Sequence, residues 1–152
     1  MLLSDLLTSE RVRVPLRGTT KDALLEELVE VLRDAGAVAD AEGVLRAVRE
    51  RERVLSTGVG SGVAIPHGKS EGVAELAMAA GVVPQPVDFD ALDGEPVSLL
   101  FLLVGPDSAA GQHVKALSRI SRLVRRDAFR ERLSAARDPE EFVALVAEAE
   151  AA

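Results

Sequence analysis

The chain has 152 residues, enough for one compact domain with a hydrophobic core and too few for two. Hydrophobic residues make up 47% of it and aromatic residues 3%, which predicts a folded globular protein with a core of Leu, Val, Ile and Ala. The formal net charge of −7 argues against a general attraction to nucleic acid or anionic membranes, and the absence of cysteine excludes disulfides and thiolate metal sites.

The amino terminus, Met1 to Asp5, lacks the basic region and the continuous apolar run of a signal peptide. No apolar run reaches the roughly 20 residues that a membrane-spanning helix needs. We therefore expect a cytoplasmic protein without direct membrane insertion and without a nucleic-acid partner.

The first predicted element is a short strand over residues 12–16. Pro15 has no N–H to donate to a neighbouring strand, so this strand should lie at an edge of the sheet and not in its centre. Thr19 and Asp22 are predicted to form a capping box that opens a helix, and Gly36 is predicted to end it.

Asp40 is predicted to cap a second helix that turns Val44 and Val48 inward. This helix ends in the mixed-charge run 49–53. We interpret most of that run as a solvated helix face, with Arg51 as the exception because of its spacing from the histidine motif described below.

Three further strands are predicted at residues 63–65, 76–83 and 97–104. The last is almost wholly apolar, as expected of a central strand that is covered on both faces.

Helices follow these strands, the first over about 108–126. Asp127 is predicted to cap a short helix, and residues 138–141, Asp-Pro-Glu-Glu, form a complete helix start. Helices alternating with strands predict a single α/β domain of three layers, with a mixed sheet flanked by helices.

The most informative segment is residues 56–69, in which Gly58, Gly60 and Gly62 precede Pro66 and His67. Glycine permits positive φ and close approach to a ligand, and Pro66 stiffens the backbone that presents the imidazole. A rigidly presented histidine among backbone N–H groups favours a nucleophile that handles an anion, with phosphate as the leading candidate.

Phosphoryl transfer requires in-line placement and neutralisation of the phosphoryl oxygens. A neutral imidazole keeps one lone pair for attack on phosphorus. The Gly68 N–H and the amides of the glycine loop could supply dipoles and Arg51 a full charge, whereas Thr57 and Ser61 are hydrogen-bond donors or simply shape the loop.

The second histidine, His113, has two interpretations. It shares a helix face with Ala116 and Ile120, so it could be a core histidine. Its place near the start of a helix also favours a neutral ring, which could donate to a phosphoryl oxygen or hold His67 in one tautomer.

Two other constellations compete with this interpretation. His67, His113 and a nearby carboxylate could bind a metal ion, but neither histidine has compact ligand spacing. A serine hydrolase would need a nucleophile elbow, which the sequence lacks. We predict neither a metal ion nor a cofactor.

Residues 57–68, Thr-Gly-Val-Gly-Ser-Gly-Val-Ala-Ile-Pro-His-Gly, resemble the phosphorylation-site signature of the fructose/mannitol-type EIIA components of the bacterial phosphoenolpyruvate-dependent sugar phosphotransferase system, a family that includes nitrogen-regulatory EIIA proteins. Arg51, the segment 87–97 and His113 match further family features. The resemblance runs from about Leu6 to Ala147 and implies that residues 1–152 form one EIIA type-2 domain.

The resemblance implies that the ε2 nitrogen of His67 accepts a phosphoryl group from the phosphocarrier HPr, with His113 as the second active-site histidine. The group would pass to a cysteine of an EIIB component for sugar uptake, or its presence would regulate binding to partner proteins. Because both steps join two proteins, we expect an apolar docking surface that includes Val59, Val63 and residues near His113.

Overall fold

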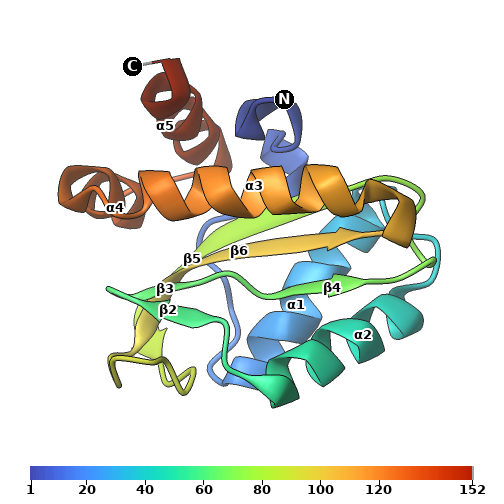
Figure 1. Ribbon diagram of the computed structural model, residues 1–152. Helices are drawn as coiled ribbons and strands as arrows, with labels where there is room; N and C mark the ends of the chain where they lie inside the picture. The colour runs from blue at the N-terminus through green and yellow to red at the C-terminus, as the bar shows by residue number, and fades with distance from the viewer. Residues whose placement is uncertain (152) are drawn as a thin grey trace.

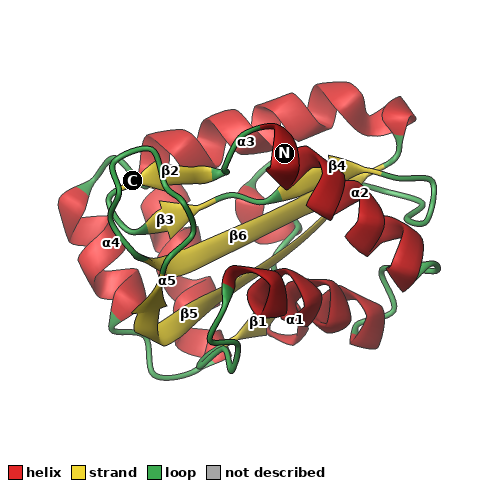
Figure 2. Cartoon of the chain, turned by 90° about the horizontal axis from the view of Figure 1, so that it is seen from below, coloured by secondary structure: helices red, strands yellow, loops and turns green. Residues whose placement is uncertain are grey.

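The most apolar segment of the chain forms the central strand of the sheet. In the computed structural model, which describes residues 1–151, this strand is β6 (Val97–Gly105). It pairs antiparallel with β5 (Ala77–Val87) and parallel with β3 (Val63–Ala64) and β4 (His67–Lys69). Figure 2 shows β5 and β6 as the long strands that run through the middle of the molecule.

Two short strands complete this six-stranded sheet, which has the order β1-β5-β6-β3-β2 with β4 paired to β6. β1 (Val12–Arg13) lies parallel to β5 at one edge, as predicted, but it is shorter than the predicted strand 12–16 and ends before Pro15. β2 (Gly58–Gly60) lies antiparallel to β3 at the other edge. The predicted mixed sheet is confirmed. β2 and β4 were not expected as strands, because glycine-rich segments carry no strand-like apolar pattern.

The side chains of β6 alternate between two cores. Leu99, Phe101 and Leu103 pack on one face, and Leu100, Leu102 and Val104 pack on the other. Both faces are apolar because helices cover both, which is why the strand reads as a continuous hydrophobic run.

The helices divide between the two faces (Figure 1). α1 (Lys21–Asp34) and α2 (Ala41–Val54) cover one face, while α3 (Ala110–Leu123), α4 (Asp127–Ser134) and α5 (Pro139–Ala151) cover the other. The short 3-10 turns η1 (Leu3–Asp5), η2 (Ser9–Arg11) and η3 (Asp107–Ala109) complete the elements. No helix within residues 1–151 combines the length and the apolar character that a membrane crossing requires.

The first two helices begin close to the predicted residues. Asp40 caps α2 as expected, accepting a hydrogen bond from the Gly43 N–H at 3.0 Å. The cap predicted at Thr19 is wrong by one residue: Thr20 accepts from the Ala23 N–H at 3.1 Å. The helix therefore starts one residue later than a box with Asp22 at its third position would require.

The last two helices differ in how they begin. Asp138 accepts from the Glu141 N–H at 2.8 Å, which confirms the predicted start of α5. Asp127 does not cap α4; it is the first helical residue, and its carboxylate pairs with Arg130 instead. An acidic side chain in a first turn still interacts favourably with the helix dipole.

Gly81 shows how tightly the edge of the sheet is packed. A Cβ atom placed on it would lie 2.6 Å from the Arg13 carbonyl oxygen and 2.6 Å from the Cδ1 atom of Leu16. We expect Gly81→Ala to lower the free energy of unfolding by about 1–3 kcal/mol, because β1 must move to admit the methyl group.

Gly111→Ala is the matched control, since a Cβ atom there meets nothing within 4 Å and the residue lies in α3. Alanine should stabilise this helix by about 0.5–1 kcal/mol. Urea unfolding of both variants tests the pair, and equal stability of Gly81→Ala and the parent chain would contradict the packing argument.

Candidate functional site

His67 opens β4, and its ring is fixed by a main-chain hydrogen bond. The Nδ1 atom lies 2.9 Å from the carbonyl oxygen of Ile65. A carbonyl can only accept, so Nδ1 carries the proton and Nε2 keeps an unprotonated lone pair. The arrangement produces the tautomer that a nucleophilic Nε2 needs.

The environment of His67 also keeps the ring neutral. Burial lowers the pKa of His67 from its ordinary 6.5, and the positive charge of Arg51 lowers it further. The hydrogen bond to Ile65 and the negative charge of Glu52 act in the opposite direction without reversing the shift. At neutral pH the half-buried imidazole is therefore uncharged, with an unprotonated Nε2.

His113 lies against His67, as the functional interpretation requires. It is the fourth residue of α3, and the two ring centroids are 5.7 Å apart with an interplanar angle of 68°. Burial lowers the pKa of His113 to about 4, and His67 and Lys69 contribute to the shift. No hydrogen bond within residues 1–151 engages either ring nitrogen, so a neutral N–H remains to be donated.

Arg51 belongs to the last turn of α2. Its guanidinium donates to the carbonyl oxygen of Leu55 at 2.8 Å, which holds the side chain at the end of the helix. Its positive charge lowers the pKa of His67. The structure thus brings His67 and His113 into contact, whereas Arg51 makes no hydrogen bond to either ring within residues 1–151.

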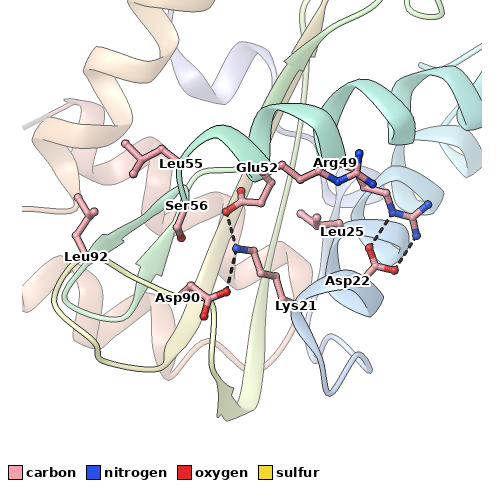
Figure 3. A pocket seen from close by; sticks show the side chains of 10 residues that line it. Lys21, Asp22, Leu25, Arg49, Glu52, Leu55, Ser56, Asp90 and Leu92 are labelled. Carbon is pink, nitrogen blue, oxygen red and sulfur yellow. Dashed lines mark hydrogen bonds and ion pairs between the residues drawn. The ribbon is translucent and has the colours of Figure 1, made fainter.

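Thr57 is buried, and it is hydrogen-bonded to Glu52 of α2. The Glu52 carboxylate accepts from the Thr57 N–H at 2.8 Å and from the Thr57 hydroxyl. The Lys21 ammonium lies 2.9 Å from the same carboxylate and 3.6 Å from the carboxylate of Asp90. Figure 3 marks both ion pairs with dashed lines. The hydroxyl proton of Thr57 is therefore used inside the protein.

Glu52 was not identified as a site residue from the sequence. It was assigned to a solvated run, yet its side chain is buried. Val44 and Val48 are buried on the same helix, and a further step of four residues reaches Glu52. This spacing of four residues indicates that Glu52 lies on the buried face of the helix, but the charged residues on either side of it favour the interpretation as a solvated run.

Hydrogen bonds also connect Thr57 to His67 through Ile65. The Ile65 N–H donates to the Thr57 carbonyl oxygen at 3.0 Å, and the Ile65 carbonyl accepts from the His67 ring. Glu52 therefore supports the segment that sets the orientation of the imidazole.

Ser61 lies away from the two histidines, at the tip of the β2–β3 hairpin. Along β6, Val63 pairs with Leu99 and His67 pairs with Leu103. Four residues of β6, roughly 13 Å, therefore separate the start of β3, next to the Ser61 turn, from His67. The Ser61 N–H donates to the Asp93 carboxylate at 2.9 Å. The predicted contact of Ser61 with a phosphoryl group on His67 is not supported by this placement.

Gly68 serves packing. The Leu103 N–H donates to the Pro66 carbonyl oxygen at 3.0 Å, so the next donor of this parallel ladder, the Gly68 N–H, is directed at the Leu103 carbonyl. A Cβ atom on Gly68 would lie 3.1 Å from the backbone nitrogen of Val48. The glycine lets α2 approach the sheet, and its N–H does not point to the site as predicted.

Val63 does not belong to the predicted docking surface. Val59 and Val114 are exposed, with 49% and 66% of their surface accessible, whereas Val63 is fully buried. Val63 lies in β3 with its side chain in the core beneath α3, so it cannot contact a partner.

The low pKa of His113 predicts a pH dependence of stability. The unfolded ring binds a proton near pH 6.5 and the folded ring near pH 4, so the free energy of unfolding falls as pH falls between these values. The loss due to this residue approaches about 3 kcal/mol at the acid end.

His113→Gln removes the titrating group and should show a shallower loss. Urea unfolding of both proteins at pH 7 and pH 4.5 measures the difference. Parallel pH profiles would show that burial is not what keeps this ring neutral.

Comparisons with known proteins agree with this geometry. The family model described as "Phosphoenolpyruvate-dependent sugar phosphotransferase system, EIIA 2" matches residues 5–149. A nitrogen regulatory protein of Bradyrhizobium diazoefficiens is 35% identical, with 97% of this chain and 95% of that protein covered. The fructose-specific EIIABC component of Bacillus subtilis is 34% identical over 96% of this chain, which spans only 23% of that protein.

Solved structures show the same fold. The nitrogen regulatory protein IIA-Ntr of Neisseria meningitidis superimposes with a TM-score of 0.87 at 34% identity, covering 95% of this chain and 98% of that one. The IIA mannitol structure from Escherichia coli gives a TM-score of 0.79 at 21% identity, covering 92% and 98%. With its paired histidines and a family match over nearly its whole length, the chain belongs to the EIIA type-2 family of the phosphoenolpyruvate-dependent sugar phosphotransferase system.

Proposed function

We propose that the chain is a cytoplasmic phosphocarrier in which Nε2 of His67 accepts a phosphoryl group from the phosphohistidine of HPr and passes it to a cysteine of an EIIB component. The observation that carries this proposal is the hydrogen bond from Nδ1 of His67 to the Ile65 carbonyl. It leaves Nε2 unprotonated, so the N–P bond of the donor can break as the Nε2–P bond forms, and no proton has to leave Nε2.

His113 and Arg51 would stabilise the transferred group. The phosphoryl oxygens carry charge that must be neutralised in the transition state. A neutral His113 can donate its N–H to one oxygen, and the depressed pKa ensures that it is neutral before transfer. Arg51 supplies a full positive charge from α2, on an element different from either histidine.

Thr57, Ser61 and Gly68 have different parts in this proposal from those expected of direct phosphoryl ligands. Thr57 orders the backbone in front of His67 through its hydrogen bonds to Glu52 and Ile65. Ser61 closes the hairpin, and Gly68 admits α2.

A regulatory function is the second candidate. Nitrogen regulatory proteins of Bradyrhizobium diazoefficiens and Pseudomonas aeruginosa are each 35% identical to this chain and match over most of their own length. In this alternative the same phosphohistidine would control association with a target protein. Both candidates share the acceptance of a phosphoryl group on His67.

The decisive experiment combines the protein with phosphoenolpyruvate, enzyme I and HPr and measures intact mass. We expect one added phosphoryl group, with nitrogen-15 and phosphorus-31 NMR locating it on Nε2 of His67. His67→Ala should fold and remain unmodified, because the ring is half-buried and makes one hydrogen bond. Stoichiometric modification of His67→Ala would refute the proposal.

The onward step separates the two candidates. Loss of the phosphoryl group on addition of a fructose-type EIIB protein supports transport. A phosphoprotein that is stable to EIIB but differs from the unmodified form in binding a target supports regulation.

Arg51→Lys tests the charge at the end of α2. Guanidinium can donate two parallel hydrogen bonds to phosphoryl oxygens, whereas ammonium acts as a point charge on a more flexible stem. We expect the transfer rate from phospho-HPr to fall about tenfold or more, equivalent to roughly 1.4 kcal/mol of transition-state stabilisation.

Arg53→Lys is the matched control, because Arg53 lies in the same turn of α2 and does not bind the Leu55 carbonyl. Rapid-quench kinetics measure both variants. An Arg51→Lys rate equal to that of the control would remove Arg51 from the transfer step.

A further inference from the structure

Positive charge is concentrated in one segment of this acidic protein. Residues 108–126 contain five of the 18 Lys and Arg residues and none of the 25 Asp and Glu residues, so the rest of the chain carries a net charge of −12. Nearly all of this segment is α3 and the residues that follow it. The separation of charge is therefore a property of α3 and of the turn that follows it.

Three of these cations form a line on the helix, and a fourth follows its end. Lys115, Arg119 and Arg122 lie at intervals of four and three residues, which places them on one face of α3. Arg126 comes after the helix and lines the same hollow as Arg119 and Arg122. At 1.5 Å per residue the helical part of the line, from Lys115 to Arg122, extends for roughly 10 Å. We call these four residues the basic stripe.

The basic stripe has no acidic counterpart within the described chain. None of its members takes part in an ion pair or a side-chain hydrogen bond among residues 1–151, whereas Arg49 on α2 binds both Asp22 and Glu26. Like charges three and four residues apart destabilise a helix. The helix dipole compensates only within the last turn, so it does not account for Lys115 and Arg119.

The stripe borders a groove and belongs to the helix that carries His113. Arg119, Arg122 and Arg126 line a hollow of about 180 Å³ between α3 and the end of α5. Glu150 lines it too, but its carboxylate accepts from the Leu3 and Ser4 N–H groups. At the other end, Lys115 follows His113 by two residues, so it lies on the exposed face of α3, opposite the buried face that carries His113.

We propose that the basic stripe is a docking surface for a partner protein that presents a line of carboxylates, and that it selects this partner among proteins that can reach His67. The proposal rests on the phosphocarrier function, since it concerns the partner of that site. Arginine pairs with carboxylates through two parallel hydrogen bonds, so several such pairs fix the orientation of the partner as well as its charge.

The rest of the molecule disfavours the other polyanions. A net charge of −12 outside the segment repels extended polyanions such as nucleic acid and anionic membranes, which would face more of the surface than the stripe. The chain has no Trp or Tyr and only four Phe residues, of which Phe89, Phe101 and Phe142 are fully buried. Stacking surfaces for bases are therefore scarce.

The test uses two labelled helical peptides of equal composition. In the first, three Glu residues are spaced at intervals of four and three, to match Lys115, Arg119 and Arg122; in the second, the same residues are scrambled. We expect the first to bind the full chain at least about tenfold more tightly in fluorescence anisotropy, a difference of about 1.4 kcal/mol. Equal affinities, or no binding of the first peptide, would overturn the proposal.

Charge-reversal variants locate the binding. Arg119→Glu with Arg122→Glu should abolish the preference for the first peptide. Arg17→Glu with Arg46→Glu makes the same change in net charge at two exposed residues on the opposite layer and should preserve it. Loss of the preference in both double variants would show an effect of net charge alone and would refute the stripe.

Two further measurements distinguish this proposal from other classes of partner and from the proposed phosphocarrier function. Tighter binding of single-stranded DNA or of phosphatidylserine vesicles than of the first peptide would assign the stripe to a different class of partner and overturn the proposal. Phosphorylation of each variant by phosphoramidate, a small donor that needs no docking, reports on His67. Peptide binding without phosphorylation refutes the phosphocarrier function, and phosphorylation without peptide binding refutes the stripe.

Discussion

The geometry of the histidine site depends on one buried carboxylate. Glu52, near the end of α2, accepts both the N–H and the hydroxyl of Thr57 and pairs with Lys21 of α1. A buried charge without partners destabilises a protein strongly, typically by about 3–5 kcal/mol when one partner is removed. The two helices and the β2 segment must therefore meet at this residue, and their meeting fixes the backbone that presents His67.

Lys21 extends this constraint to the loop between β5 and β6. Its ammonium donates to the Phe89 carbonyl at 3.2 Å and lies 5.0 Å from the centre of the Phe89 ring. Ser56 donates to the same carbonyl, and the Leu92 N–H binds Gly58. Segments far apart in the sequence thus hold one another around the start of β2, with Glu52 at their centre.

The sequence predicted the parts of this structure whose signal is local. The continuous apolar run of β6 and the helix start at Asp138 depend on neighbouring residues, and both were placed correctly. The burial of Glu52 and of Val63 depends on partners far away in the chain, so local composition misplaced them. The glycine motif identified His67, yet it could not show that Gly68 serves the approach of α2.

The main-chain acceptor of His67 has a consequence for the energy of the phosphorylated state. A carboxylate in the place of the Ile65 carbonyl would stabilise a positively charged ring and would make the imidazole a poorer leaving group. A neutral carbonyl fixes the tautomer without adding that charge. In the proposed phosphocarrier, the bond between nitrogen and phosphorus would therefore stay weak enough for the group to move on, and no substitution of the side chain at position 65 removes this acceptor.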